Sequence, residues 1–177
     1  MSLVTTPLNV AESYCSVTDA DTYHAARGHA SWAALTTQVK EECLRKATDY
    51  IEQKYFGRWS GDRVEFEQTL SLPRMNMPNK DFESPLPYSY VGSYYYPSDS
   101  IPAGVVRACA ELALKSNAVE LLPDVGRAKI KTKVEDAVDV EYSEYSSQLT
   151  SYTAIDAMLM PYLMDGSNGY NHKVIRA

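Results

Sequence analysis

The sequence is poor in the residues that build disulfide-linked, zinc-binding or membrane-spanning structures. It contains only Cys15, Cys43 and Cys109, an odd number at wide spacings that argues against a disulfide framework and against a zinc site. We expect all three to be buried as small apolar residues in a protein made in a reducing cytoplasm. The apolar runs are short and interrupted, so no segment is long enough to cross a bilayer and no membrane partner is expected.

Patterns typical of catalysis are also missing. His24, His29 and His172 are scattered, and none lies at ligand spacing from a cysteine or carboxylate cluster. The chain contains no GxSxG, HExxH, P-loop or dinucleotide-binding fingerprint, and no recognisable acid and base pair. We therefore expect no catalytic residue, no metal site and no cofactor, and we predict that the protein is not an enzyme.

The chain has fewer basic than acidic residues. The chain has 17 Lys and Arg against 23 Asp and Glu, which gives a net charge of −6. Proteins that bind nucleic acid draw most of their affinity from neutralised phosphates and normally carry a basic surplus. The charge balance therefore argues against DNA binding, although it leaves room for a local basic patch.

One stretch could form such a patch. Arg127, Lys129, Lys131 and Lys133 alternate with small or apolar residues, as in a strand with one basic face, and they are the candidate DNA-proximal residues. An equally regular acidic alternation follows over residues 138–142.

A turn at 135–137 would join these two stretches into a hairpin. Lys133 would then lie across from Asp139, and Lys131 across from Glu141, so that opposite charges share one face. This pairing would leave only Arg127 and Lys129 without an acidic residue across from them. The same register pairs Val134 with Val138 and Thr132 with Val140 on the other face.

Tyrosine is abundant, with 14 residues beside only 3 phenylalanines. Tyrosine rings supply a broad contact area with few rotatable bonds and keep a polar end for water or a partner. Base stacking by these rings would lack phosphate contacts, because no Lys or Arg lies between Lys80 and Arg107. We therefore expect a protein-contact surface, with an exposed or self-packed loop as the alternative. The candidate contact residues are Tyr88, Tyr90, Tyr94, Tyr95 and Tyr96.

The periodicity predicts a single, mainly α domain over residues 1–177: a small helical bundle with a long loop insertion, a short β-hairpin, and a C-terminal helix followed by a flexible tail. Trp32 and Trp59 should anchor the core. A capping pattern at Thr18 predicts a first helix that ends at Gly28. Helical spacing predicts three more helices, from residue 37 to before 57, from 101 to 122, and from about 150 to a stop at Pro161.

Four segments do not fit helices. Residues 1–13 lack periodicity and should form an arm that orders on contact. Residues 64–72 should form an extended passage, half-buried through Val64, Phe66, Leu70 and Leu72, that stops at Pro73. Arg74 is a candidate protein contact. Residues 75–100 should form a projecting loop. The tail at 165–177 ends in a basic, β-prone tip that can add to a neighbour's sheet edge, with Tyr170, Val174 and Ile175 as its candidate contacts.

Short motifs over most of residues 13–163 carry a family resemblance. The motifs are Ser13-Tyr14, Val17, Ala20-Asp21-Thr22-Tyr23, Trp32, Ala47-Thr48-Asp49-Tyr50-Ile51, Trp59-Ser60-Gly61-Asp62-Arg63, residues 68–74, Ile101-Pro102 and Arg107-Ala108. In these motifs the chain resembles the small head–tail connector (head-completion adaptor) proteins of tailed bacteriophages, whose relatives are often labelled DnaT-like single-stranded DNA-binding proteins. It departs from that pattern in its tyrosine-rich stretch at 88–96.

The resemblance implies a virion structural protein, assembled in the host cytoplasm and located in the neck of the particle. Its subunits would form a ring, commonly a dodecamer, below the portal protein and would dock a downstream neck or tail protein. Genomic DNA would pass through the ring without sequence-specific binding. The alternative is a single-stranded DNA-binding replication or packaging factor, which would need the basic stretch to be exposed.

Overall fold

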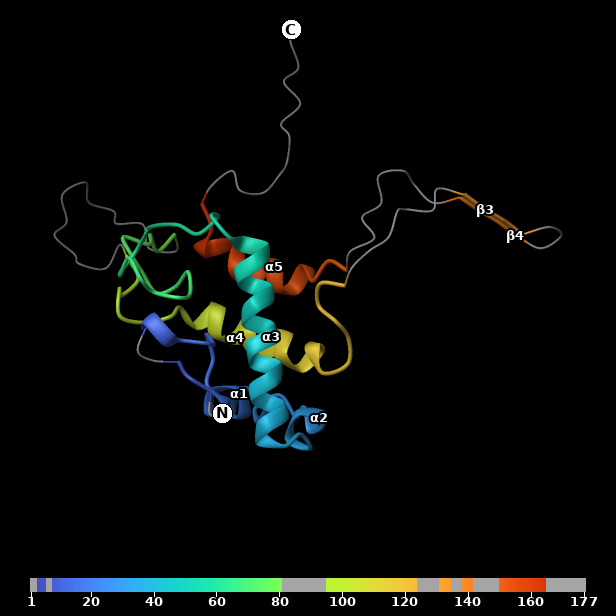
Figure 1. Cartoon of the computed structure of the whole chain (residues 1–177), viewed down its shortest axis with the longest axis horizontal. Helices are drawn as coiled ribbons and strands as arrows, with labels where there is room; N and C mark the ends of the chain where they lie inside the picture. The colour runs from blue at the N-terminus through green and yellow to red at the C-terminus, as the bar shows by residue number, and fades with distance from the viewer. Residues whose placement is uncertain are drawn as a thin grey trace, which may run out of the picture.

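The computed structural model describes residues 3–5, 8–80, 95–123, 131–134, 138–141 and 150–164, and the strands at 131–134 and 138–141 by their backbone alone. In these residues the chain is mainly helical, as predicted. One long helix, α3, runs through the middle of the body (Figure 1). The helices are α1 (Val17–Ala25), α2 (Ala30–Ala33), α3 (Thr37–Tyr55), α4 (Ala103–Ser116) and α5 (Thr153–Leu159), with 3₁₀ turns η1 (Leu8–Val10) and η2 (Met160–Tyr162).

Three groups of helices pack around α3 (Figure 1). The first two helices lie beside its N-terminal half, α4 crosses near its middle, and α5 lies toward its C-terminal end. The side chain of Thr36 caps α3 by accepting the main-chain N–H of Val39 at 3.4 Å. The first helix is capped by Ser16, which accepts the N–H of Asp19 at 3.1 Å, so the predicted cap at Thr18 is wrong by two residues.

Small residues make α4 the helix most completely enclosed by the fold. Ala108, Cys109 and Ala113 are buried against α3. At the other end, a Cβ on Gly104 would lie 2.5 Å from the hydroxyl oxygen of Tyr162, so glycine there permits the close approach of the C-terminal segment. The helix predicted over residues 101–122 is confirmed, but it ends at Ser116, earlier than expected.

The predicted anchors and thiols lie in the core. Trp32 and Trp59 are 1% and 2% exposed, which confirms their assignment as hydrophobic anchors. All three cysteines, Cys15, Cys43 and Cys109, are buried and unpaired. Burial raises the thiol pKa of Cys15, and it raises that of Cys109 to about 11, as expected for small apolar core residues.

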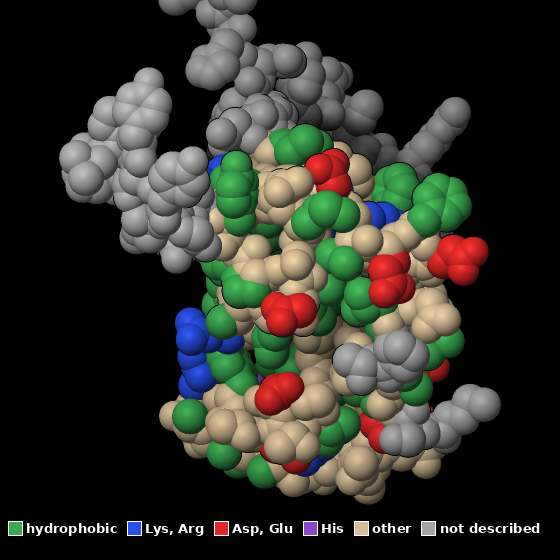
Figure 2. All heavy atoms as spheres, turned by 90° about the vertical axis from the view of Figure 1, so that its left-hand side faces the viewer, with side chains coloured by type: hydrophobic (Ala, Val, Ile, Leu, Met, Phe, Trp, Pro, Cys, Tyr) green, Lys and Arg blue, Asp and Glu red, His purple; other side chains and the backbone are tan. Residues whose placement is uncertain are grey.

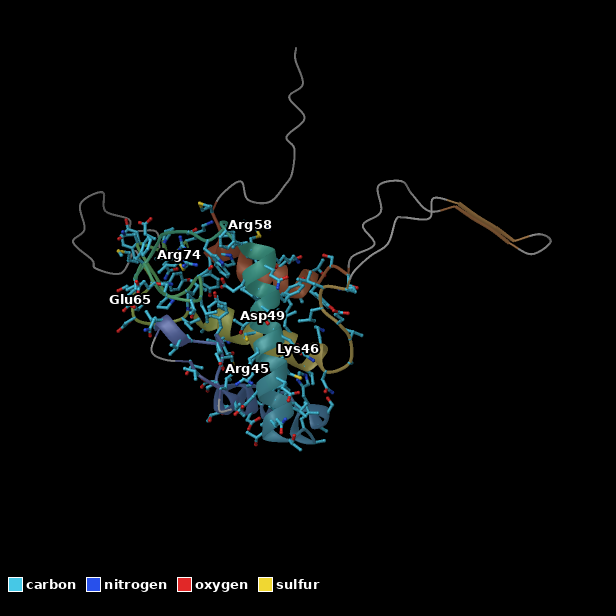
Figure 3. All side chains as sticks on the ribbon, viewed as in Figure 1. Arg45, Lys46, Asp49, Arg58, Glu65 and Arg74 are labelled. Carbon is cyan, nitrogen blue, oxygen red and sulfur yellow. The ribbon has the colours of Figure 1, made fainter. Side chains whose placement is uncertain are left out.

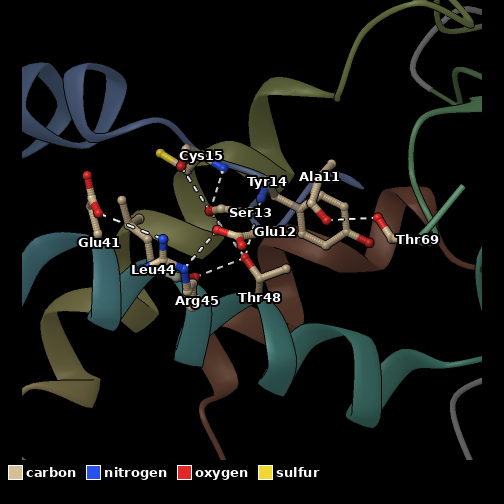
Figure 4. Close-up of polar contacts among 10 residues, drawn as sticks. All are labelled: Ala11, Glu12, Ser13, Tyr14, Cys15, Glu41, Leu44, Arg45, Thr48 and Thr69. Carbon is tan, nitrogen blue, oxygen red and sulfur yellow. Dashed lines mark hydrogen bonds and ion pairs between the residues drawn. The ribbon is translucent and has the colours of Figure 1, made fainter. Parts of the chain in front are cut away.

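Residues 8–13 belong to the body, which corrects the expected arm. The hydroxyl of Thr48 on α3 accepts the main-chain N–H of Tyr14 and donates to the hydroxyl of Ser13, both at 3.3 Å. Arg45 forms an ion pair with Glu12 at 2.9 Å (Figure 4). These contacts hold the segment along one side of α3, because buried main-chain groups need partners.

The C-terminal helix ends where proline predicts. Pro161 lies in η2, directly after α5, and cannot continue an α-helix. Tyr152 precedes the helix without a side-chain cap. Asp156 accepts hydrogen bonds from Lys54, at 2.6 Å, and from Tyr55, so it joins α5 to α3.

The predicted hairpin is present in the predicted register. Strands β3 (Lys131–Val134) and β4 (Val138–Glu141) are antiparallel. The register places Lys131 across from Glu141 and Lys133 across from Asp139. It also pairs Thr132 with Val140 and Val134 with Val138, so each of the four predicted pairs is confirmed.

Candidate functional site

The segment from residue 57 to 75, called here the braced loop, leaves the end of α3 and returns on itself. Within it, strands β1 (Asp62–Arg63) and β2 (Arg74–Met75) pair antiparallel. The extended passage expected over 64–72 is therefore a compact loop. Leu70 and Leu72 point into the core as predicted, but Phe66 does not.

One buried amide organises the middle of this loop. The side-chain oxygen of Gln68 accepts the main-chain N–H groups of Val64 and Glu65, both at 3.0 Å. Its nitrogen donates to the carbonyl oxygens of Leu70, at 2.8 Å, and Pro73, at 3.2 Å. Gln68 thus uses both lone pairs and both N–H groups of its amide. These bonds to the main chain take the place of the hydrogen bonds to a neighbouring strand that an extended strand would need.

Two further contacts fasten the loop to the body. Glu52 of α3 accepts a hydrogen bond from the hydroxyl of Ser71 at 2.8 Å and another from its main-chain N–H at 3.1 Å. Thr69 donates from its hydroxyl to the carbonyl oxygens of Leu8, at 3.0 Å, and Ala11, at 2.8 Å. The loop is therefore held both by α3 and by the N-terminal segment.

Arg74, which was predicted to contact another protein, forms hydrogen bonds within the braced loop. Its guanidinium donates to the carbonyl oxygen of Gly61 through Nη2 at 2.6 Å and through Nε at 3.1 Å. Burial lowers the pKa of Arg74, a direction expected for a cation withdrawn from water. The side chain joins β2 to Gly61, the residue that precedes β1.

The tip of the braced loop is exposed. Phe66 is 98% exposed, and Glu65 and Glu67 on either side are exposed as well. Figure 3 shows Glu65 at the outer edge of the body, on the side away from Arg45, Lys46 and Asp49 of α3. The tip therefore presents an aromatic ring between two carboxylates to the surroundings.

The tyrosine-rich stretch is described only at its C-terminal end. The main-chain N–H of Tyr96 donates to the carbonyl oxygen of Met77 at 2.9 Å, and its ring packs edge-to-face on Tyr162 with centroids 5.3 Å apart. Tyr95 is 57% exposed. Tyr96 is thus part of the packing at the base of the 75–100 segment, and Tyr95 keeps a surface available for contact. The other predicted contacts lie outside the described residues: Tyr88, Tyr90, Tyr94, Tyr170, Val174 and Ile175.

The predicted DNA-proximal residues are placed only in part. Lys131 and Lys133 lie in β3, each across from an acidic residue of β4. Arg127 and Lys129 lie outside the described residues. The register supports a hairpin face in which the two lysines are balanced by acids, because cross-strand neighbours of opposite charge attract.

Most basic side chains of the helical body are engaged within the fold. Among those described there, Lys46, Arg107 and Lys115 alone make no hydrogen bond, ion pair or ring contact. On the face shown in Figure 2, acidic side chains are spread among apolar ones, and basic ones lie mostly toward the margins. The engaged cations are Arg27, Lys40, Arg45, Lys54, Arg58, Arg63, Arg74 and Lys80.

A histidine pair lies between the first helices and α4. Nε2 of His24 is 3.1 Å from the carbonyl oxygen of Ala110, so this nitrogen carries the proton. Nδ1 of His24 then accepts the Nδ1–H of His29 at 2.8 Å. Burial lowers the pKa of His24, and the nearby His29 adds to this effect. The pair borders a cavity of about 420 Å³ that is also lined by Trp32 and Lys40.

A larger groove of about 540 Å³ runs between α3 and residues 116–122. Tyr50 and Leu121 are its buried apolar residues. Its rim carries one cation, Lys46, and two acids, Asp49 and Glu120. The groove therefore combines an apolar floor with a rim whose net charge is negative.

The described part of the chain holds no group of three or more His, Cys, Asp and Glu side chains placed to bind a metal ion. No helix in those residues is both long and apolar enough to span a bilayer. The feature that the residue pattern missed is the tip at Phe66. The available signal was the run Glu65-Phe66-Glu67, an aromatic residue between two acids in a chain with few phenylalanines.

Comparisons with known proteins place the chain in one family. No curated protein and no solved structure matches it. The sequence model of the family described as "Putative DnaT-like ssDNA binding protein" matches residues 1–177. The chain belongs to this family.

Proposed function

We propose that the protein is a non-catalytic structural subunit, a head–tail connector that forms a ring below the portal protein of a tailed phage and docks a downstream neck or tail protein. The observation that carries this proposal is the braced loop, which presents Phe66 between two exposed acids on a body whose cations are mostly engaged. An exposed aromatic on a preorganised loop suits a protein contact, whereas phosphate needs free cations.

A ring also requires that each subunit offer two different surfaces to its neighbours. A head-to-tail contact repeated around an axis closes into a ring when the rotation between copies permits it. The groove beside α3 lies away from the tip of the braced loop, as the labelled positions of Lys46 and Glu65 indicate (Figure 3). The groove and the tip are thus two separate surfaces, and this supports a subunit that contacts more than one other protein chain.

Single-stranded DNA binding is the second candidate, and the family description favours it. It would rely on the basic stretch that includes Arg127 and Lys129, because the lysines of β3 lie across from acids. Affinity of this kind falls steeply with salt. The net charge of −6 makes us rank this function below the connector.

One pair of measurements tests the proposal. The full-length protein is imaged by negative-stain electron microscopy, alone and with the portal protein of the same phage, and its affinity for an oligothymidylate of about 30 nucleotides is measured near 150 mM salt. We expect rings and weak DNA binding. Submicromolar DNA affinity that is lost on neutralising Arg127 and Lys129, in a protein that forms no ring, would favour the second candidate.

A further inference from the structure

The two described phenylalanines are the most exposed large apolar side chains in the described part of the chain. Phe66 is 98% exposed and Phe56 is 74% exposed. Isolated apolar residues are common on protein surfaces, so exposure alone would not single out either of them. What distinguishes Phe66 is the structure that holds it and the charges beside it.

The segment on both sides of Phe66 is fixed before any partner arrives. Gln68 holds the main-chain N–H groups of Val64 and Glu65, and Thr69 is tied to the N-terminal segment. A group that is ordered in the free protein loses little conformational entropy on binding, and this raises the affinity obtained from a given contact. Phe66 is thus presented as a preorganised anchor.

The charges at the tip are free for an intermolecular contact. In the part of the chain that is described, neither Glu65 nor Glu67 forms an ion pair or a side-chain hydrogen bond. The cation of the loop that is nearest in sequence, Arg63, donates to the carbonyl oxygen of Gln68 at 3.1 Å. The two carboxylates therefore remain uncompensated around the aromatic ring.

We infer that Phe66 inserts into an apolar pocket of a second protein, and that lysines or arginines on the rim of this pocket pair with Glu65 and Glu67. Buried aromatic anchors contribute most to protein interfaces, while complementary charges at the rim set specificity and the association rate. The inference rests on the proposed function, in which that second protein is the portal protein or the downstream neck protein.

Two other binding partners would suit the tip less well. Nucleic acid is disfavoured, because its phosphates would meet two carboxylates. A second copy of this chain is also disfavoured, because the large groove that its described residues offer carries Asp49 and Glu120 on the rim against the single cation Lys46. The binding partner that suits the tip is a different protein with an apolar pocket for the aromatic ring of Phe66 and basic residues on the rim for the two carboxylates.

The test uses the full-length protein and, as probes, the purified portal protein and the purified downstream neck protein of the same phage. Affinities are measured by titration for wild type, Phe66→Ala, Phe66→Leu and the double charge reversal Glu65→Lys with Glu67→Lys. The matched control is Phe56→Ala, which removes an exposed phenylalanine from the end of α3. Thermal unfolding should be unchanged in Phe66→Ala, because the side chain packs against almost nothing.

We expect one of the two probes to bind wild type and Phe56→Ala alike, and to bind Phe66→Ala at least tenfold more weakly, as for an interface hot spot of about 1.4 kcal/mol or more. Phe66→Leu should recover part of the loss. The charge reversal should slow association most at low salt. Equal binding of Phe66→Ala and wild type would overturn the inference and leave the connector intact, whereas failure of wild type to bind either probe would overturn both.

Discussion

Glu52 of α3 holds Ser71 of the braced loop by both its hydroxyl and its main-chain N–H, at 2.8 and 3.1 Å. This carboxylate also accepts the hydroxyl of Tyr14, so it joins the long helix, the loop and the N-terminal segment. The shape of the loop therefore depends on a side chain of α3 as well as on its own residues.

The first prediction concerns this carboxylate. Glu52→Ala should lower the free energy of unfolding by about 2–3 kcal/mol, because hydrogen bonds to a charged group are strong and their donors would be left unpaired. Chemical denaturation measures the change. The control is Glu42→Ala on the same helix, where an exposed carboxylate accepts only from Gln38 and the loss should stay within about 0.5 kcal/mol. Similar losses in the two variants would contradict the assigned role.

The second prediction compares two glycines of the braced loop. Both Gly57 and Gly61 have a positive φ, of 70° and 73°. A Cβ at Gly57 would meet nothing within 4 Å, whereas one at Gly61 would lie 2.4 Å from the carbonyl oxygen of Met75. Gly57→Ala should cost about 1 kcal/mol from the backbone conformation alone, and Gly61→Ala should cost more than about 2 kcal/mol because the backbone must shift. Equal costs would show that the two strands can separate freely.

The third prediction concerns pH. The pKa of His24 is lowered in the folded state, so the unfolded chain binds more protons and stability rises with pH in this range. The stabilisation should be complete above about pH 6.5 and should be lost as the pH falls through the folded-state pKa. His24→Gln should flatten the stability profile between about pH 6.5 and pH 5, while His172→Gln in the tail should not. A profile unchanged by His24→Gln would refute this assignment.

The fourth prediction concerns the hairpin. Lys131→Glu should weaken the β3–β4 pairing, and the added change Glu141→Lys should restore it, because the two residues lie across from each other. The coupling should be well under about 1 kcal/mol, as for exposed pairs. A double-mutant cycle measures it. Zero coupling between Lys131 and Glu141, together with coupling of Lys133 and Asp139 to other residues, would show that the strands pair in another register in solution.

Local patterns predicted the parts of the fold that local interactions determine. The spacing of Val39, Cys43 and Ala47 predicts α3, and the alternation over 131–141 predicts the hairpin and its register. In both cases, residues close in sequence contact one another, and a one-residue shift would reverse the faces. The alternation of charges also predicted correctly that Lys131 lies across from Glu141 and Lys133 across from Asp139.

Contacts distant in sequence were not predictable. Residues 8–13 lack periodicity, yet their main-chain oxygens accept hydrogen bonds from Thr69, about sixty residues away. The alternation of Val64 with Phe66 indicated a half-buried strand, but the buried amide of Gln68 binds the main chain there and turns Phe66 outward. A polar side chain that satisfies several main-chain groups has no periodic signal, and for this reason the candidate site was missed.

The burial of the three thiols has a practical consequence. A thiol reacts as its thiolate, and burial both blocks access to Cys15, Cys43 and Cys109 and holds the pKa of Cys15 and Cys109 above the usual range. A cysteine introduced at an exposed position such as Glu65 would therefore react far faster with a maleimide dye than the native three. The wild-type background can thus carry a single fluorophore at the tip of the braced loop, without removal of any native cysteine.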